Sequence, residues 1–460
     1  MTGVGSTEPA RSAGVGFAGA GAGLRRPVWA LHVLIVGLAF HNLVMSQLWR
    51  AGVRGNALTV VAAWKDVLLL VALALVVRSV PRPTIAADWL ALAFGAFVVL
   101  YGLLPQSLLD GGATHRGVLY AARHDLLPVG AYFLGRGLAL TGAERARLCR
   151  TVLVTAAVVA LYGLIDVSAV PLSWWRHSGA PGWFQDQLGL RYNGLSGLPE
   201  NFAYNAGNGV VFRRLTSTFL SPLATAYLLV VAMFFVPFRL WWGRAVALLL
   251  FAALLWTHTR AGVIALVVAL LVLALVRRRA LMILLAVAVA VIGFAFVKTY
   301  THFGPRTHYT ATELHYQQTH PATPGSSSND ATTSGDSSIS EHASSLREGA
   351  RTVLHHPWGF GLGNAGVTAA RTHVRIRAGE STYTELGVEV GVLGVLAFVL
   401  WSLVLLRGAL ARVPWIGAAF AAVLFLGLQT DIIGVPWIAV TVFALVGDAV
   451  RTPLHQHRNV

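Results

Sequence analysis

Apolar runs long enough to cross a bilayer recur along this chain, and they constrain the fold more than any other feature. Hydrophobic residues make up 56% of the 460 residues and charged residues only 12%, which is far from the composition of a soluble domain. A membrane-spanning helix needs about 20 consecutive apolar residues. The sequence therefore predicts about twelve spans, near 28–46, 57–77, 86–104, 117–135, 151–169, 216–237, 243–257, 261–276, 280–297, 383–406, 413–430 and 432–450.

Two of these spans have polar interruptions. The fourth is weak because Arg123, His124 and Asp125 lie within it, and only Arg277, Arg278 and Arg279 separate the eighth from the ninth. In lipid the backbone must satisfy its own hydrogen bonds, so spanning segments of this length are helices. We predict an all-α, polytopic integral membrane protein with about twelve transmembrane helices and one large extracytoplasmic loop carrying short helices.

The chain divides by composition into five parts. The first, 1–27, is rich in Gly and Ala and lacks the pattern of a cleavable signal peptide, so we expect a disordered cytoplasmic leader. The flanks of the polar loop, LHYQQ and EHASSLREGARTVLHH, favour short helices. The other parts are, in order, nine spans with an outer loop at 170–213 (28–297), the large polar loop (298–382), three spans (383–450) and a tail (451–460).

Basic residues give the orientation, because Lys and Arg in short loops mark the cytoplasmic side. With twelve spans they all fall on the same face as the N-terminus. Both termini are therefore predicted to be cytoplasmic, and the two polar loops external. We interpret the net charge of +16 as this topological bias and expect contacts with membrane lipids, not with nucleic acid. The residues concerned are Arg25, Arg26, Arg78, Arg82, Arg136, Arg145, Arg147, Arg150, Arg239, Arg244, Arg277, Arg278, Arg279, Arg407, Arg412 and Arg451.

Four cations lie near the outer ends of predicted spans, where charge is costly and usually functional. Each alone can be an interfacial cation or can pair with a neighbour such as Asp66 or Asp125. Together they favour an anionic ligand, because the planar arginine fork suits phosphate oxygens. The sequence thus predicts a site for a phosphate-bearing lipid that contains Lys65, Arg123, Arg214 and Arg260.

Four motifs follow one another in a fixed order around the large loop. They are RRLTSTFLSPLATA (213–226), THTRAG (257–262), HPWGFGLGNAG (356–366) and ESTYTELGVEVGVLG (380–394). In this order the chain resembles the O-antigen ligase and O-antigen polymerase superfamily of bacterial membrane glycosyltransferases. The resemblance implies glycosyl transfer without metal or cofactor, from an undecaprenyl-diphosphate-linked glycan to a glycan acceptor. It also implies a location at the outer face of the cytoplasmic membrane.

The resemblance also suggests roles for individual residues. Arg214 and Arg260 match the arginines that such enzymes use to hold the donor diphosphate. Ligases of the family tend to carry His-Asn where this chain has Glu380 and Ser381. A catalytic histidine therefore cannot be transferred to this chain, and a polymerase-like activity is favoured over a ligase.

Transfer to an acceptor hydroxyl needs a base. Glu380 is the predicted base because it lies where the large loop returns to the membrane. It could instead pair with Arg375 or Arg377 and anchor the loop. His342 and Glu348 are further candidates within the loop.

Two other patterns have simpler explanations. GFGLGNAG lacks the strand and helix context of a dinucleotide-binding loop, and is more typical of a turn that allows close backbone approach. The loop histidines match no metal-ligand spacing, so no metal is expected. The alternative functions are a transporter or flippase of lipid-linked oligosaccharide, and a non-catalytic scaffold for envelope assembly. Neither an internal repeat nor charge at the membrane midplane, both common in transporters, is evident.

Overall fold

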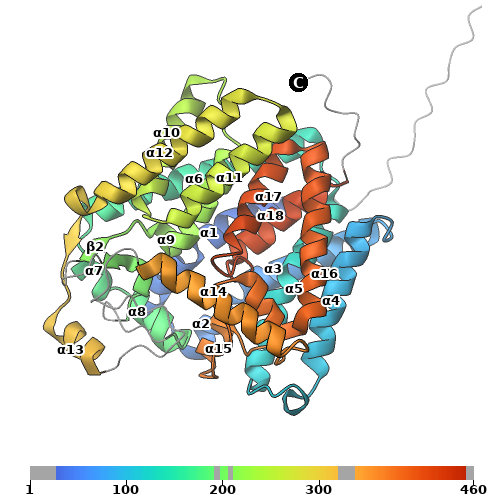
Figure 1. Cartoon of the computed structure of the whole chain (residues 1–460), viewed down its shortest axis with the longest axis horizontal. Helices are drawn as coiled ribbons and strands as arrows, with labels where there is room; N and C mark the ends of the chain where they lie inside the picture. The colour runs from blue at the N-terminus through green and yellow to red at the C-terminus, as the bar shows by residue number, and fades with distance from the viewer. Residues whose placement is uncertain (1–26, 191–196, 206–210, 320–336, 452–460) are drawn as a thin grey trace, which may run out of the picture.

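The computed structural model describes residues 27–190, 197–205, 211–319 and 337–451. Helices dominate this part of the chain (Figure 1). Those of the first half are α1 (Val28–Arg50), α2 (Gly55–Ala62), α3 (Trp64–Val76), α4 (Ala86–Leu103), α5 (His115–Leu138), α6 (Gly142–Ala169), α7 (Leu172–Arg176), α8 (Ala180–Gly182) and α9 (Pro222–Met233). Those of the second half are α10 (Trp241–Trp256), α11 (Arg260–Arg277), α12 (Ala280–Phe303), α13 (Ala311–Thr319), α14 (Ser337–His355), α15 (Gly366–Arg371), α16 (Thr382–Arg412), α17 (Pro414–Leu426) and α18 (Pro436–Ala449).

The helices agree with the predicted spans. Within the described ranges, seven segments are long and apolar enough to cross a membrane, namely α1, α2 with α3, α4, α6, α11, α12 and α16. The shorter apolar helices α9, α10, α17 and α18 coincide with four further predicted spans. Helix α5 coincides with the weak fourth span. The protein is therefore a helical, multi-pass membrane protein, and a total of twelve crossings stays a prediction.

Local sequence explains several helix boundaries. Proline occupies the first turn of α9, α17 and α18, where its missing N–H costs nothing. Helix α6 starts with a capping box in which Thr141 and Glu144 bind each other's backbone N–H groups. Arg278 adopts a left-handed conformation after α11, which allows α12 to turn back within the basic triplet.

Small residues bring α5 against α18. A Cβ added to Gly135 would lie 2.0 Å from the carbonyl oxygen of Ala444, and one on Gly447 would lie 2.4 Å from that of Tyr132. Such close backbone approach is how membrane helices gain packing energy when lipid is as apolar as their side chains. The contact fixes α5, which bears His124, against the C-terminal helices.

Two arginines of the predicted cytoplasmic cluster are buried in ion pairs. Arg136 Nη2 lies 2.9 Å from Asp88 Oδ2, and Arg145 Nε lies 2.6 Å from Asp448 Oδ2. All four side chains are buried, so removing one partner would leave a costly isolated charge. These pairs hold α4, α5, α6 and α18 together at one end of the bundle.

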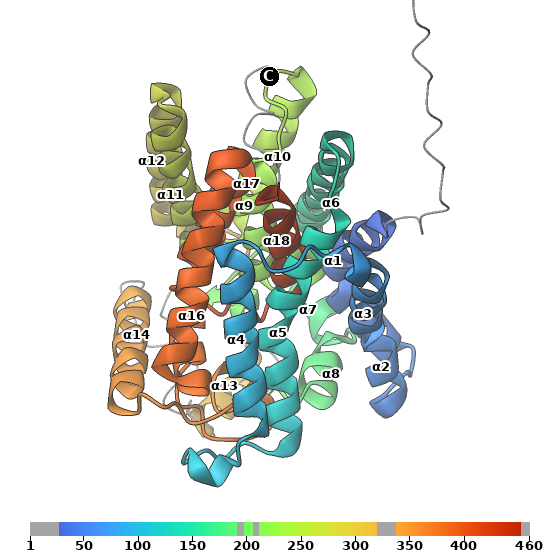
Figure 2. The same cartoon turned by 90° about the vertical axis from the view of Figure 1, so that its right-hand side faces the viewer.

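The loop elements gather at the opposite end of the bundle. Helices α8 and α13 lie at the lower end in Figure 2, whereas the tips of α6, α10 and α12 form the upper end. Helices α13 and α14 confirm the short helices expected in the large loop. Three strands form a small antiparallel sheet in the order β1 (Ala203–Asn205), β2 (Val211–Arg213) and β3 (Arg306–Thr307). This sheet joins the two polar loops.

The glycine-rich motif docks on a break in α16. Gly391 interrupts that helix with a φ of 71°, and a Cβ there would lie 2.7 Å from the carbonyl oxygen of Pro357. The Phe360 N–H donates to the carbonyl oxygen of Val388 at 2.6 Å, and the Val392 N–H donates to that of Pro357 at 2.8 Å. Only glycine fits such a contact without strain. The expected close backbone approach is confirmed.

Candidate functional site

Two consecutive arginines at the end of β2 have different environments. Arg213 is buried and paired with Asp166, at 3.1 Å between Nη2 and Oδ2. It also donates to the backbone oxygens of Asp166 and Val170 at the end of α6. Trp175 donates to the other carboxylate oxygen of Asp166 at 2.7 Å. Both terminal nitrogens of the Arg213 guanidinium therefore hold the sheet to α6.

Arg214 is buried without a carboxylate partner in the part of the chain that the structure describes. Its guanidinium donates to the oxygen of Thr257 (2.9 Å), to the hydroxyl of Thr259 (3.1 Å), and more weakly to His258 O and Asn201 Oδ1 (both 3.4 Å). Neutral acceptors orient the group but do not neutralise it. A buried, uncompensated charge is unfavourable in a folded protein, so this arrangement fits a site that receives an anion.

The charge of Arg214 persists under physiological conditions. Burial, with a contribution from Arg260, lowers the pKa of Arg214 to about 10. The guanidinium therefore stays protonated at neutral pH and can bind an anion there.

Arg260 is the first residue of α11 and follows the Thr257–His258–Thr259 turn that holds Arg214. It is half-buried, and its charge acts on both Arg214 and His258. The structure therefore brings the two arginines of the RRLTS and THTRAG motifs to one turn. Their binding role stays a prediction.

His258 lies between the arginines and an aromatic cluster. Its ring stacks on Tyr300 at 4.4 Å between centroids and lies 4.5 Å from the ring of Tyr204. Burial, together with the charges of Arg214 and Arg260, lowers the pKa of His258 to about 3. The imidazole is therefore neutral and adds no charge to the arginine pair.

The other two predicted cations belong to a different contact. Arg123 Nε lies 2.9 Å from Asp66 Oδ1, so this arginine pairs with a neighbour. Lys65 donates to Ala62 O at 2.8 Å and lies 3.4 Å from His41 Nε2. Both residues lie where α3 meets α5, whereas Arg214 contacts the turn before α11. The four cations thus form two groups instead of one.

A histidine bridges two carboxylates beside Arg123. His124 Nδ1 lies 2.7 Å from Asp125 Oδ1, and His124 Nε2 lies 2.8 Å from Asp431 Oδ2. Asp431 belongs to the loop between α17 and α18, where it accepts from the N–H of Ile433 at 3.1 Å and the hydroxyl of Thr382 at 3.3 Å. Burial raises the pKa of Asp431, but contact with His124 outweighs this and lowers it.

Two further carboxylates from α16 approach this histidine. Glu385 and Glu389 are both buried, and both interact electrostatically with His124. Glu389 accepts from the Gly363 N–H at 2.8 Å. A Cβ on Gly366 would lie 2.0 Å from Glu385 Oε2. The glycine loop therefore covers these two carboxylates.

One buried side chain lies within reach of both centres. Tyr227 on α9 is buried and interacts electrostatically with both Arg214 and Asp431. The arginine turn and the histidine–carboxylate cluster therefore border the same region of the protein. Among the described residues, no group of three or more His, Cys, Asp and Glu side chains is arranged to hold a metal ion.

The predicted loop residues lie at the edge of this region. Glu380 is half-buried, has a φ of 67°, and its backbone hydrogen-bonds the carboxylate of Glu385. Glu348 is exposed on α14. The side chain of His342 lies outside the described residues. Glu380 thus contacts one of the buried carboxylates through its backbone.

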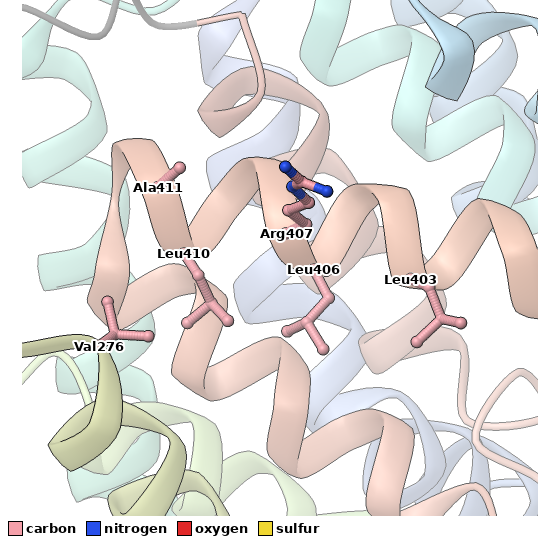
Figure 3. Close-up of a pocket in the computed structure, with 6 residues that line it drawn as sticks. All are labelled: Val276, Leu403, Leu406, Arg407, Leu410 and Ala411. Atoms are coloured by element: carbon pink, nitrogen blue, oxygen red, sulfur yellow. The ribbon is translucent and has the colours of Figure 1, made fainter.

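A separate groove of about 490 Å³ lies between α11 and α16. Its walls are almost entirely apolar, formed by Val276, Leu403, Leu406, Leu410 and Ala411 with Arg407 at the rim (Figure 3). Such a surface suits lipid chains in a membrane protein. It lies near the predicted cytoplasmic ends of these helices and is not part of the candidate site.

Sequence reasoning missed His124, Asp431, Glu385 and Glu389. In the sequence, His124 is evident only as an interruption of the fourth span. A charged residue inside an apolar span usually has a functional partner, and this rule was the available signal. It could not identify Asp431, which lies 307 positions later in the chain.

Comparison with known proteins supports the resemblance to a known family. No curated protein matches the chain. Residues 245–399 match the family described as O-antigen ligase, and this segment contains the THTRAG turn, the large loop and the first half of α16. The match confirms the resemblance to the O-antigen ligase and polymerase superfamily over residues 245–399, and it suggests a membrane enzyme that acts on surface polysaccharide.

Proposed function

We propose that the protein is a glycosyltransferase that takes an undecaprenyl-diphosphate-linked glycan as donor and extends a surface polysaccharide. We propose a polymerase-like activity, at the outer face of the bacterial cytoplasmic membrane. The observation that carries the proposal is Arg214, a buried guanidinium next to Arg260 whose acceptors among the described residues are all neutral. Two guanidinium groups can neutralise a diphosphate and need no metal ion for that task.

The proposed reaction has one bond made and one broken. The acceptor hydroxyl oxygen attacks the anomeric carbon of the donor, and the bond from that carbon to the lipid diphosphate breaks. Negative charge then develops on the departing diphosphate. Arg214 and Arg260 stabilise this charge in a site of low dielectric, where such contacts are strongest.

The proton of the acceptor hydroxyl needs a base within hydrogen-bond reach. We propose the Asp431–His124 pair for this role. Both side chains are partly accessible, at 11% and 23%, whereas Asp125 behind them is fully buried. Asp431 can accept the proton and become neutral, while His124 keeps its contact with the carboxylate of Asp125. Glu380, predicted from the sequence, is the competing candidate because it lies beside Glu385.

The missing histidine at Glu380–Ser381 supports polymerisation over ligation. Ser381 is buried and donates to the oxygen of Gly427 at 3.0 Å. This serine anchors the loop that carries Asp431. At that position the chain has no imidazole, and Glu380 is the titratable group there.

The alternative, a transporter or flippase, has one structural observation in its favour. Helix α16 is interrupted at Gly391, and interrupted helices are common in transporters. However, backbone of the glycine loop fills this break. The break therefore has a structural explanation that does not require transport.

A deletion strain tests the proposed function. Loss of a polymerase leaves single lipid-linked repeat units, so glycan profiling should show these units accumulating at the outer face. Loss of a flippase would trap the units at the inner face. Accumulation at the inner face would contradict the proposal.

A further inference from the structure

A second polar site lies at the other end of the bundle, between α1 and α6. A groove of about 330 Å³ is lined there by His32, Val36, Arg147, Arg150, Thr151, Val154 and Thr155. This volume is at the lower end of the range for small-molecule sites, about 300–1,000 Å³. The groove shares no residue with the candidate catalytic site.

The two arginines of the groove have no carboxylate partner among the described ion pairs. Arg147 and Arg150 lie three positions apart, so their side chains share one face of α6. The nearby carboxylate of Glu144 accepts from the backbone and hydroxyl of Thr141 in the capping box. Arg145, on another face of the helix, is paired with Asp448. Arg147 and Arg150 are thus available to bind an external anion.

The groove also contains a preformed polar contact and an apolar wall. His32 Nδ1 lies 2.8 Å from the hydroxyl of Thr151, and this contact orients two of the side chains that line the groove. Val36 and Val154 are exposed on the adjoining surface, further along α1 and α6 towards the middle of the membrane. An occupant can therefore place a charged end against the arginines and a hydrocarbon chain along the valines.

We propose that this groove binds the phosphate headgroup of an anionic phospholipid in the cytoplasmic leaflet. Both helices begin near the groove, at the face that the positive-inside pattern assigns to the cytoplasm. Anionic lipids are enriched in that leaflet and attract basic residues at the membrane surface. A lipid here would fix α1 against α6. The proposal is independent of the glycosyltransferase function.

The test uses the full-length protein in detergent. Thermal unfolding is followed with added phosphatidylglycerol, phosphatidylcholine or inorganic phosphate, and bound lipid is counted by native mass spectrometry. The groove variant is Arg147→Gln with Arg150→Gln. The matched control is Arg78→Gln with Arg82→Gln, which removes two exposed arginines from another loop predicted to be on the same face.

We expect phosphatidylglycerol to raise the unfolding midpoint of the wild-type and control proteins. The groove variant should bind it at least tenfold more weakly, since loss of one charge-assisted contact weakens binding by about ten- to a hundredfold. Arg147→Lys with Arg150→Lys should be intermediate, because the charge remains and the fork is lost. An equal loss in the control, or unchanged binding by the groove variant, would overturn the proposal. So would an equal effect of inorganic phosphate, which would indicate a free-anion site.

Discussion

Arg213 pairs with Asp166 at 3.1 Å, whereas the next residue along the chain, Arg214, has no acidic partner among the described residues. The first arginine joins β2 to α6. The guanidinium of the second donates to the turn before α11, where its described acceptors are neutral oxygens. Adjacent residues of the same type thus have opposite roles, one structural and one suited to binding. Their variants should separate stability from activity.

Replacement of Arg213 should lower the stability of the folded protein. Arg213→Gln leaves Asp166 buried without its cation, and breaking a buried ion pair from one side costs about 3–5 kcal/mol. We expect a large fall in the thermal unfolding midpoint of the purified protein. The control is Arg214→Gln, since that side chain has no ion pair within the described part of the chain.

Replacement of Arg214 should remove activity and preserve stability. Arg214→Gln takes away a buried, uncompensated charge, so the unfolding midpoint should stay the same or rise. Donor binding should weaken by about ten- to a hundredfold, the effect of one charge-assisted contact. Arg214→Lys should also be impaired, because a point charge replaces a bidentate fork. Full activity of an Arg214→Ala and Arg260→Ala double variant, at normal expression, would exclude the diphosphate site.

Donor binding should depend on pH in the alkaline range. Burial lowers the pKa of Arg214 to about 10, so the cation is fully present at neutral pH and is lost as pH rises through about 10. Affinity for the donor should therefore be constant from pH 6 to 8 and fall near pH 10. His258, whose pKa is lowered to about 3, should contribute no step between pH 5 and 8. Binding curves of the wild type and of His258→Gln should agree over that range.

The spans could be predicted from sequence because hydropathy is a local property, and each predicted span coincides with a helix or helix pair. The short helices of the large loop were predictable for the same reason. The sequence alone could not show which of the two arginines in the RRLTS motif is available to bind an anion. The RRLTS motif contains two, and only the position of Asp166, 47 residues earlier, shows that Arg213 is engaged.

The grouping of the four outer cations depended on tertiary contacts as well. The sequence suggested one site, because all four lie near the outer ends of spans. In the fold, Arg123 reaches Asp66 across 57 positions, while Arg214 reaches Thr259 across 45. Hydropathy and spacing cannot distinguish these two outcomes, since both depend on which helices become neighbours.

The break in α16 should be essential for the shape of the site. Gly391→Ala places a methyl group 2.7 Å from the carbonyl oxygen of Pro357 at a φ of 71°. Strain of about 1–3 kcal/mol is expected at such a position, and the glycine loop should detach from α16. Proteolysis of the loop should then be faster. The control is Gly379→Ala, whose Cβ would lie 4.0 Å from the side chain of Ile376, and it should be as resistant to proteolysis as the wild type.

The identity of the base is the last prediction. Asp431→Asn keeps the shape of the side chain and the hydrogen bonds from Ile433 and Thr382, but removes the proton acceptor. Turnover should fall by about 10²–10⁴-fold, the usual contribution of general-base catalysis, while donor binding stays near the wild-type value. Glu380→Gln is the matched comparison from the edge of the same region.

Three results decide between the candidates. If Asp431→Asn loses turnover and Glu380→Gln retains it, the base is the Asp431–His124 pair and Glu380 holds the loop through its contact with Glu385. If the outcomes are reversed, Glu380 is the base, as the sequence predicts. If both variants bind donor and turn over normally, neither carboxylate takes the proton, and the proposed chemistry at this end of α16 is wrong.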